Sequence, residues 1–258
     1  MKCNICESES NFIFNEKVLR KYRVDYFQCG SCGFVQTESP YWLEEAYKTV
    51  IAATDTGILK RNKEFANATT LLLRTFFDRK ARFLDYSGGF GIFCRMMRDN
   101  GYDFYWSDPY AQNLLVRGFE HRPGTTYQLI TTFESFEHFA DPLQEINKMF
   151  PFSENIFFST RLLPDDKLPV KDWWYYAFPD GQHVSLYTRK ALQELANRFG
   201  KRLYTNHRNL HLLTNLNLNK LLFTSLTYAS YIIPTTLIKL GLKSKTHSDI
   251  SLVYRDPL

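Results

Sequence analysis

Four of the five cysteines in this chain are arranged in a pattern that could bind a metal ion. They form two pairs, Cys3-x2-Cys6 and Cys29-x2-Cys32. The two-residue spacing lets both thiolates of a pair face one ion, and four thiolates make the closed tetrahedral set of a structural zinc site. Two disulfides are the competing interpretation, which the lack of an apparent secretion signal disfavours. The sequence therefore predicts a structural zinc ion in a small N-terminal ribbon.

A second group of residues could bind a nucleotide. The segment Phe83–Gly91 (FLDYSGGFG) reads as an apolar strand that ends in Asp85 and runs into a Ser/Gly-rich turn before a helix. Glycine lets backbone come close to a ligand, and a helix start offers unpaired N–H groups. Such a turn after a first parallel strand is typical of a nucleotide site. The dinucleotide fingerprint is incomplete, because Cys94 stands where its third glycine would be.

Two more strands are each followed by acidic residues. Phe104–Asp108 reads as a strand whose terminal carboxylate suits the two hydroxyls of a ribose, although Asp108 with Pro109 could also simply open a turn. Leu129–Phe133 reads as the next strand, before Glu134–Leu143 (ESFEHFADPL). In that segment Asp141 suits an N-cap, Pro142 the first helical position and Gln144 a capping box.

In this order the three segments resemble the motifs of class I S-adenosylmethionine-dependent methyltransferases. The first glycine of the family's G-x-G-x-G turn is replaced by Ser87, a departure that could weaken cofactor binding. The resemblance implies an α/β, Rossmann-like methyltransferase fold with a mostly parallel seven-stranded sheet, the last strand antiparallel, and S-adenosylmethionine as cofactor. On matching positions it implies these cofactor-binding residues: Asp85, Tyr86, Ser87, Gly88, Gly89, Gly91, Asp108, Pro109, Phe133 and Glu134.

The four-cysteine ribbon ahead of such a domain is similar to that of two groups of enzymes. One group is sugar C-methyltransferases and related enzymes of saccharide biosynthesis, and the other is ribosomal RNA methyltransferases. The formal net charge of +5, without a dense Lys/Arg run, argues against a dedicated nucleic-acid binder. We therefore expect a small-molecule or saccharide-linked acceptor. An RNA methyltransferase and a catalytically inactive, methyltransferase-like binding protein remain as alternatives.

Methyl transfer from a sulfonium is a displacement that depends mainly on position and alignment. A base is needed only where the acceptor must lose a proton. The candidates for that role are His138 and His183, with Glu134 next. Each histidine could instead be a structural or polar-anchoring residue.

The chain divides in sequence into three parts. We expect a zinc ribbon over residues 1–40, a helical lid or linker over 41–78, and a methyltransferase domain over 79–258 with a helical insertion around 212–243. Tyr47, Asp55 and Arg61 could line a lid, and the lid could equally be a packing helix pair. Leu203–Thr205 and Ile250–Tyr254 read as the final strands.

Composition is ordinary for a globular protein, with 44% hydrophobic and 23% charged residues among 258. The aromatic run Trp173–Tyr176, in a predicted loop, fits either a binding pocket or core packing. The uncharged stretch Leu221–Ile238 contains several Ser and Thr residues and is broken by Pro234, which favours a pair of apolar helices over a membrane span. Peripheral membrane contact through 212–243 is the alternative. Without an apparent signal peptide we expect a cytoplasmic location.

Overall fold

The computed structural model describes residues 1–48, 51, 54–164 and 171–255. It contains a four-stranded sheet in the order β1-β2-β3-β8 and a six-stranded sheet in the order β5-β4-β6-β7-β10-β9. The chain forms two compact units that are interleaved in sequence. Unit 1 comprises Met1–Ala52, Glu134–Lys148 and Phe158–Asn215, and unit 2 comprises Ala53–Phe133, Met149–Phe157 and Leu216–Leu258. Residues 49–50 and 52–53 of the predicted helical lid or linker lie outside the described residues, as do residues 165–170.

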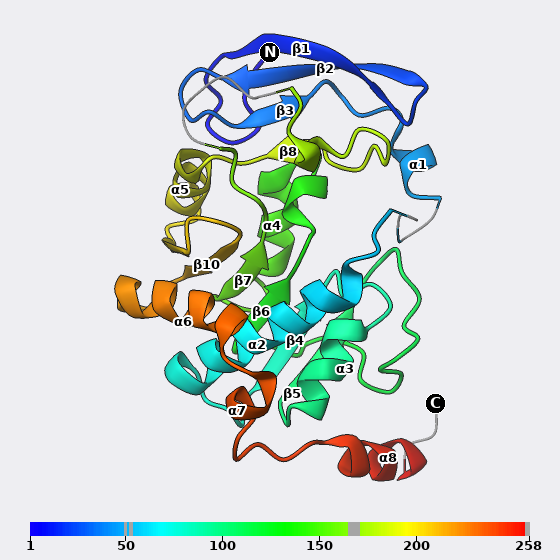
Figure 1. Cartoon of the computed structure of the whole chain (residues 1–258), viewed down its shortest axis with the longest axis vertical. Coiled ribbons are helices and arrows are strands. Elements are labelled where there is room, and N and C mark those ends of the chain that lie inside the picture. The colour runs from blue at the N-terminus through cyan, green and yellow to red at the C-terminus, as the bar shows by residue number, and fades with distance from the viewer. Residues whose placement is uncertain (49–50, 52–53, 165–170, 256–258) are drawn as a thin grey trace. The chain divides into compact units, whose positions relative to one another are not determined.

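The small sheet of unit 1 begins with an antiparallel hairpin of β1 (Ser10–Val18) and β2 (Tyr22–Cys29). It continues through β3 (Val35–Thr37), which pairs with β8 (Ser185–Leu186) from a distant part of the sequence (Figure 1). Its buried core consists of Val18, Val24, Tyr26, Val35, Trp42, Ala46, Leu163, Tyr175, Tyr176, Val184 and Leu186. The aromatic run is thus divided, because Tyr175 and Tyr176 are core residues whereas Trp174 is exposed.

The remaining elements of unit 1 are short. They are α1 (Leu43–Ala46), the 3₁₀ turns η1 (Phe136–His138) and η2 (Trp174–Tyr176), α5 (Arg189–Arg198), β9 (Arg202–Thr205) and β10 (Leu210–Thr214). The α5 helix starts at Thr188, whose hydroxyl accepts the N–H of Ala191 and donates to the carbonyl of Cys32. This hydroxyl therefore caps a helix and also holds the cysteine-bearing loop.

Helix α4 (Pro142–Met149) begins as the sequence predicts. The Asp141 carboxylate accepts the N–H of Gln144 at 3.0 Å, which satisfies one of the unpaired donors at the helix start. The predicted N-cap is confirmed.

In unit 2 the first three predicted strands are confirmed. β4 (Arg82–Tyr86) pairs in parallel with β5 (Asp103–Ser107) on one side and with β6 (Leu129–Thr132) on the other. Parallel strands end at the same sheet edge, so the turn after β4 and the loop after β5 meet there. Helix α3 (Ile92–Asp99) follows the glycine turn and packs against both β4 and β5. β7 (Ile156–Ser159) follows β6 in the strand order, before β10 and β9.

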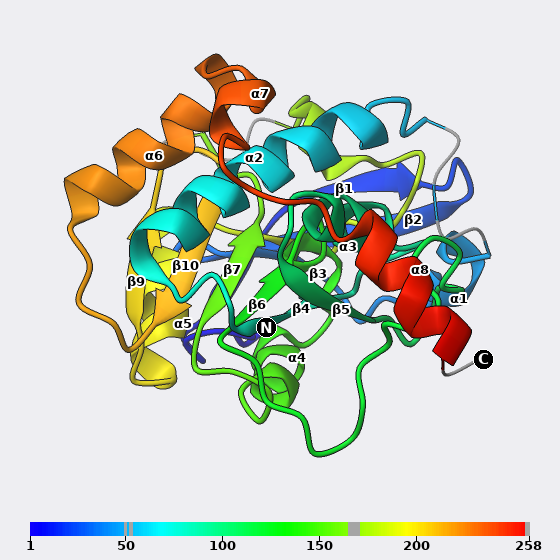
Figure 2. The same cartoon turned by 90° about the horizontal axis from the view of Figure 1, so that it is seen from below.

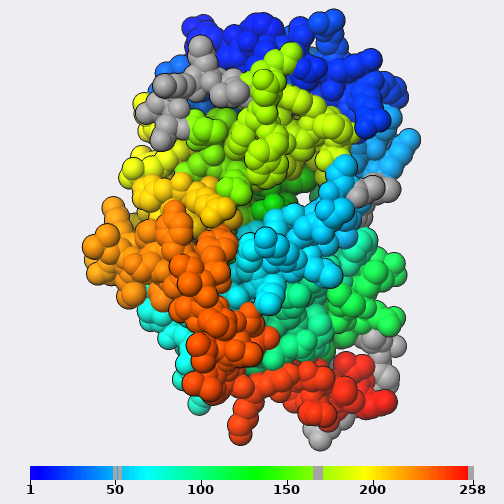
Figure 3. All heavy atoms as spheres, in the orientation of Figure 1, coloured from blue at the N-terminus to red at the C-terminus, as the bar shows by residue number. Residues whose placement is uncertain are grey.

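Two further helices of unit 2 correspond to the predicted apolar pair. α6 (Lys220–Ile232) lies along α2 (Ile58–Phe76), and α7 (Thr235–Ile238) follows Pro234 (Figure 2). Asn67 of α2 donates to the carbonyl of Ser230 and to the hydroxyl of Thr235, which fixes the pair on α2. Figure 3 shows the atoms of α6 and α7, in orange, on the surface of this unit. None of the helices that the structure describes has the length and apolar character needed to cross a membrane.

Three expectations about the sheet and the insertion are wrong. The described part of the larger sheet has six strands rather than seven. Residues 250–254 belong to helix α8 (Thr246–Arg255) rather than to a last strand, because the buried carboxylate of Asp249 fixes this helix on Arg95 and Arg98. Residues 212–214, at the start of the predicted helical insertion, belong to β10, which pairs antiparallel with β9.

Candidate functional site

The glycine turn of unit 2 depends on left-handed backbone. Ser87, Gly89 and Gly91 have φ values of 59°, 54° and 88°. A Cβ on Gly88 would lie 2.7 Å from the Trp106 ring, and one on Gly91 would lie 2.8 Å from a Val116 methyl group. A Cβ on Gly89 would meet nothing within 4 Å. Neighbouring side chains therefore exclude any larger residue at Gly88 and Gly91, whereas Gly89 faces open space of the kind that a ligand could fill.

Ser87 carries a side chain and yet has left-handed backbone in this turn. That conformation costs an L-residue about 1–2 kcal/mol of folding free energy. We expect Ser87→Gly to raise the free energy of unfolding by about 1 kcal/mol, since part of the gain is offset by the greater freedom of glycine in the unfolded chain. Urea denaturation of the two proteins measures the difference. A matched Ser107→Gly change, in β5, should instead lower the stability. An unchanged or lower stability of Ser87→Gly would contradict this account of the turn.

Asp108 ties the glycine turn to the loop after β5. Its Oδ2 accepts the N–H of Gly89 at 2.9 Å, and its Oδ1 accepts the N–H groups of Tyr110 and Ala111 at 2.8 and 2.9 Å. The indole N–H of Trp106 donates to the Gly89 carbonyl at 2.9 Å. Both the N–H and the carbonyl of Gly89 are therefore hydrogen-bonded to side chains. The carboxylate thus has the turn-opening role. Pro109, which follows it, is exposed.

Asp85 lies beneath the turn and is almost completely buried, with 2% of its surface exposed. Its Oδ1 accepts the hydroxyl of Thr131 at 3.2 Å, and its Oδ2 has no hydrogen-bond partner. Burial raises the pKa of this carboxyl to about 8. A buried polar atom without a partner beside a glycine turn is a site where a bound group could donate. Tyr86, the next residue, is half-buried and its ring is tilted against Phe152.

Phe133 ends the third of the predicted strands of unit 2 and is packed among aromatic rings. It stacks on Phe65 with ring centroids 4.4 Å apart and an interplanar angle of 13°, and it meets Phe93 edge-on at 4.9 Å. These contacts give Phe133 a packing role within this unit.

In unit 1, Glu134 is held in an unusual backbone conformation with φ at 51°. Its N–H donates to the Ser159 hydroxyl at 2.8 Å, and that hydroxyl donates back to Glu134 Oε1 at 2.6 Å. This reciprocal pair stabilises a left-handed backbone that a glutamate rarely adopts. Strained positions of this kind are often found at functional sites.

The structure brings both candidate histidines of unit 1 together. The rings of His138 and His183 lie with centroids 5.0 Å apart. Nδ1 of His138 is hydrogen-bonded to the Tyr47 hydroxyl at 2.8 Å, and Nδ1 of His183 donates to the Tyr175 carbonyl at 2.5 Å. Burial, with a smaller contribution from the charge of His183, holds the pKa of His138 well below its usual range. His138 is therefore a neutral imidazole at neutral pH, able to accept a proton or to bind a cation.

Three residues are candidates for lining a lid. The hydroxyl of Tyr47 is hydrogen-bonded to Nδ1 of His138 within unit 1. Asp55 and Arg61 form an ion pair of 2.7 Å within unit 2. Each of the three thus has a structural contact inside its own unit.

Glu137 is the residue of this group that the sequence reasoning did not select. Its side chain is completely buried, and neither carboxylate oxygen meets the geometric criteria for a hydrogen bond, although the hydroxyl groups of Tyr175 and Thr160 lie near enough to stabilise its charged form. Burial and the nearby charge of Glu134 raise its pKa to about 8. The signal that could have found it is the Glu134-x2-Glu137-His138 spacing, which places two carboxyls and an imidazole around one 3₁₀ turn.

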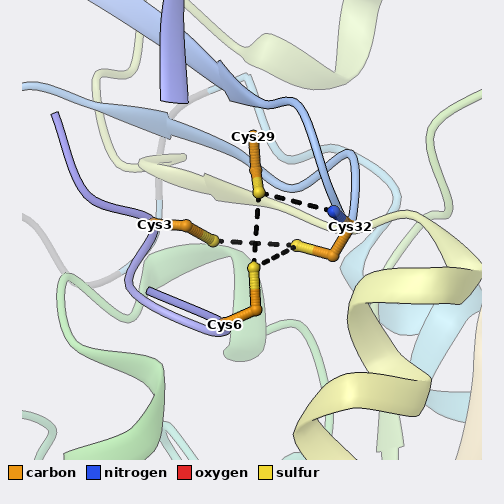
Figure 4. Close-up of side chains that lie close together, drawn as sticks. All are labelled: Cys3, Cys6, Cys29 and Cys32. Atoms are coloured by element: carbon orange, nitrogen blue, oxygen red, sulfur yellow. Dashed lines mark hydrogen bonds between the residues drawn. The ribbon is translucent and has the colours of Figure 1, made fainter. Parts of the chain in front are cut away.

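The four predicted cysteine ligands also lie together, in unit 1 (Figure 4). The sulfur atoms of Cys3 and Cys32 are 3.7 Å apart, those of Cys6 and Cys29 are 3.4 Å apart, and those of Cys6 and Cys32 are 3.6 Å apart. Zinc–thiolate bonds of about 2.3 Å set tetrahedral edges of about 3.8 Å, so the four sulfurs fit one zinc ion. No disulfide joins them.

Backbone N–H groups surround these sulfurs, as expected around thiolates. The N–H of Ile5 donates to Cys3 Sγ, and those of Ser31 and Cys32 donate to Cys29 Sγ, each at 3.4 Å. Such donors stabilise negative charge on sulfur and orient metal ligands. The arrangement is therefore that of a closed four-thiolate site.

Comparison with known proteins yields one family match. Residues 59–205 match a family model described as a methyltransferase domain. No curated protein sequence matches the chain.

Several solved structures have a similar backbone. The plantazolicin methyltransferase BpumL in complex with SAH is 11% identical, with a TM-score of 0.46 over 69% of this chain and 95% of that chain. The magnesium protoporphyrin IX methyltransferase ChlM from Synechocystis PCC 6803 with bound SAH is 13% identical, with a TM-score of 0.43 over 66% and 90%. An O-methyltransferase family protein from Burkholderia thailandensis is 12% identical, with a TM-score of 0.46 over 69% and 68%. At these values the likenesses add nothing to the family match.

Proposed function

This chain belongs to the family of methyltransferase domains, and from that premise we propose that it transfers a methyl group from S-adenosylmethionine to a small-molecule or saccharide-linked acceptor. The observation that carries the proposal is the open space over Gly89, beside carboxylates that face the same turn. A Rossmann-like sheet binds its nucleotide at this edge, where the first parallel strands end.

The cofactor would be held by residues of the glycine turn and of the loops after β5 and β6. Asp108 would accept the ribose hydroxyls through lone pairs beside those already used by the backbone. Asp85 would accept through Oδ2, and the backbone at Gly89 would approach the ligand closely. The proposed set is Asp85, Tyr86, Ser87, Gly88, Gly89, Gly91, Asp108, Pro109, Phe133 and Glu134.

S-adenosylmethionine supplies a methyl group on a sulfonium, which leaves as a neutral thioether. The protein therefore contributes mainly position and alignment. Where the acceptor is a hydroxyl or a carbon acid, a base must also remove a proton. We assign that role to His138 or His183, since His138 is held neutral by burial and is oriented by Tyr47.

The four cysteines would hold a structural zinc ion. Four thiolates leave no open coordination position, so the ion would fix the ribbon and take no part in methyl transfer. The acceptor class rests on the resemblance to sugar C-methyltransferases and on the absence of a dense Lys/Arg run in the sequence.

Calorimetric titration of zinc-analysed protein with S-adenosylmethionine, its demethylated product and NADH tests the proposal. We expect saturable binding of the first two and none of NADH. Asp108→Ala should weaken cofactor binding about 10- to 100-fold, the effect of losing a charged hydrogen-bond acceptor. Asp108→Asn, which keeps one acceptor oxygen, should weaken cofactor binding by a smaller factor than Asp108→Ala. Thermal unfolding of each variant shows whether the turn remains folded.

Three other outcomes would contradict the proposal. Folded, zinc-loaded protein that binds neither S-adenosylmethionine nor its product would favour a catalytically inactive binding protein. Binding of NADH alone would mean that the glycine turn serves a nicotinamide cofactor. Cofactor binding together with RNA binding that weakens steeply with salt would replace the small acceptor with RNA.

A further inference from the structure

We propose that Glu137, His138 and His183 form a second metal site in unit 1, which binds a divalent transition-metal ion and is distinct from the four-cysteine cluster. The proposed site shares His138 and His183 with the base of the proposed function. An ion bound by both imidazoles would take the lone pairs that a base needs, so metal binding and proton removal by these histidines exclude each other. The proposal rests on the geometry of three side chains, on a buried carboxylate without a hydrogen bond of good geometry, and on the hydrogen bonds that orient the two imidazoles.

The three side chains converge on one point. Each offers a ligand atom, and these atoms all lie within 4.8 Å of one another. Ligands that bind one ion through bonds of about 2.0–2.2 Å lie about 3 to 4 Å apart. The upper limit of 4.8 Å is wider than such a set, so binding an ion would draw these ligand atoms closer together. Glu137 and His138 come from η1 and His183 from the segment before β8, so the site is built on packed parts of this unit.

Glu137 supplies a second argument, because it is an acidic side chain in a buried position where the side chains that favour its charged form are the hydroxyl groups of Tyr175 and Thr160. It is completely buried, and neither of its carboxylate oxygens meets the geometric criteria for a hydrogen bond. Leaving a carboxyl group buried in this way is costly for the folded protein. A bound cation is the partner that would satisfy both oxygens at once.

Each of the two histidines has one ring nitrogen in a hydrogen bond, as metal-bound histidines usually do. Nδ1 of His183 faces the Tyr175 carbonyl, which can only accept, so Nδ1 bears the proton and the lone pair lies on Nε2. Nδ1 of His138 is engaged with the Tyr47 hydroxyl. Metal-bound histidines almost always use one ring nitrogen in this manner, which fixes the orientation of the ring.

The ligand types indicate which ions fit. Two imidazoles and one carboxylate suit first-row transition metals, whereas magnesium and calcium prefer oxygen ligands alone. Three protein ligands leave coordination positions for water or for an oxygen of a small molecule, in contrast to the closed four-thiolate site. The Glu134 carboxylate, which interacts electrostatically with Glu137, adds negative charge beside the ion.

Cobalt(II) is the probe, because its absorption spectrum distinguishes thiolate from nitrogen and oxygen ligands. We would titrate Co²⁺ into zinc-loaded, full-length protein by calorimetry and by visible spectroscopy. We expect one Co²⁺ per chain to bind while zinc is retained, without thiolate charge-transfer absorption. Glu137→Gln and His183→Gln should each weaken Co²⁺ binding at least tenfold. His207→Gln, a change at an exposed histidine of the same unit, should leave it unchanged.

Circular dichroism and thermal unfolding establish whether each variant is folded. If one of the two ligand variants fails to fold, the other still tests the site. Absence of saturable Co²⁺ binding to the wild type would overturn the proposal. So would binding that persists in both folded variants, or a thiolate spectrum with displaced zinc. S-adenosylmethionine binding, measured on the same preparations, reports separately on the proposed function.

Discussion

Replacing Cys32 by serine is expected to abolish binding of the proposed zinc ion and to destabilise the ribbon of unit 1. Structural zinc sites of small ribbons contribute about 10–16 kcal/mol of apparent binding free energy, and loss of one thiolate removes much of it. Cys32 is buried, and its carbonyl accepts the hydroxyl of Thr188, the residue that caps α5. Loosening of the loop that carries Cys29 and Cys32 should therefore also affect the start of α5.

The measurements are zinc per chain by elemental analysis and thermal unfolding with and without a chelator. The wild type should carry one zinc, and Cys32→Ser should carry much less and unfold at a temperature lower by 10 °C or more, given about 4 °C per kcal/mol for a domain of this size. Cys94→Ala is the matched control, since Cys94 is buried in unit 2 outside the cluster. A Cys32→Ser protein with full zinc content and unchanged stability would contradict the four-thiolate site.

Asp249→Ala is expected to lower the free energy of unfolding by about 3 kcal/mol, because it removes the two-oxygen partner of a buried arginine and leaves that arginine with Asp103 at 3.1 Å as its remaining ion pair. Arg98 and Asp249 are both buried, and the guanidinium donates to both carboxylate oxygens at 2.8 and 2.7 Å. Arg98 also donates to the Phe104 carbonyl, so it links α3, β5 and α8 within unit 2. Asp99→Ala breaks an exposed i,i+4 pair with Arg95 and should change stability by no more than about 0.5 kcal/mol.

The same pair predicts how stability depends on pH. Burial alone would raise the pKa of Asp249, but the hydrogen bonds and charge of Arg98 outweigh it and hold the pKa below the ordinary value. Its contribution is therefore present above the unfolded-state pKa of about 3.9 and is lost as the pH falls through the lower folded-state pKa. Urea denaturation at a series of pH values from about 6 down to about 2 measures this. Equal acid sensitivity in the wild type and in Asp249→Ala would show that the pair contributes little.

The parts of the fold that could be predicted are those fixed by local chemistry. The segment Phe83–Gly91 specifies a strand, a turn and a helix through residues adjacent in sequence, and the cysteine pairs specify their own convergence. Asp141 at an N-cap is equally local. These features require no knowledge of distant contacts, and the structure contains all of them.

The features that could not be predicted depend on contacts between distant residues. Ile250–Tyr254 has the apolar, β-branched character of a strand, yet it is helical because Asp249 pairs with arginines some 150 positions earlier. Glu137 is unremarkable in sequence, and its significance comes from complete burial and from the approach of His183. Asp108 was expected at a ribose, and its observed backbone partners arise from how two loops meet.

The pairing of β3 with β8 has a consequence for synthesis of the protein on the ribosome. β3 ends at Thr37 and its partner begins at Ser185, and the Thr188 hydroxyl reaches the Cys32 carbonyl across 156 positions of sequence. At translation rates of about 5–20 residues per second, the ribbon emerges about 8 to 30 s before the strand that covers its edge. During this interval β3 is an exposed strand edge, open to pairing with other nascent chains. Chaperone binding or early zinc capture would protect the ribbon until β8 is made.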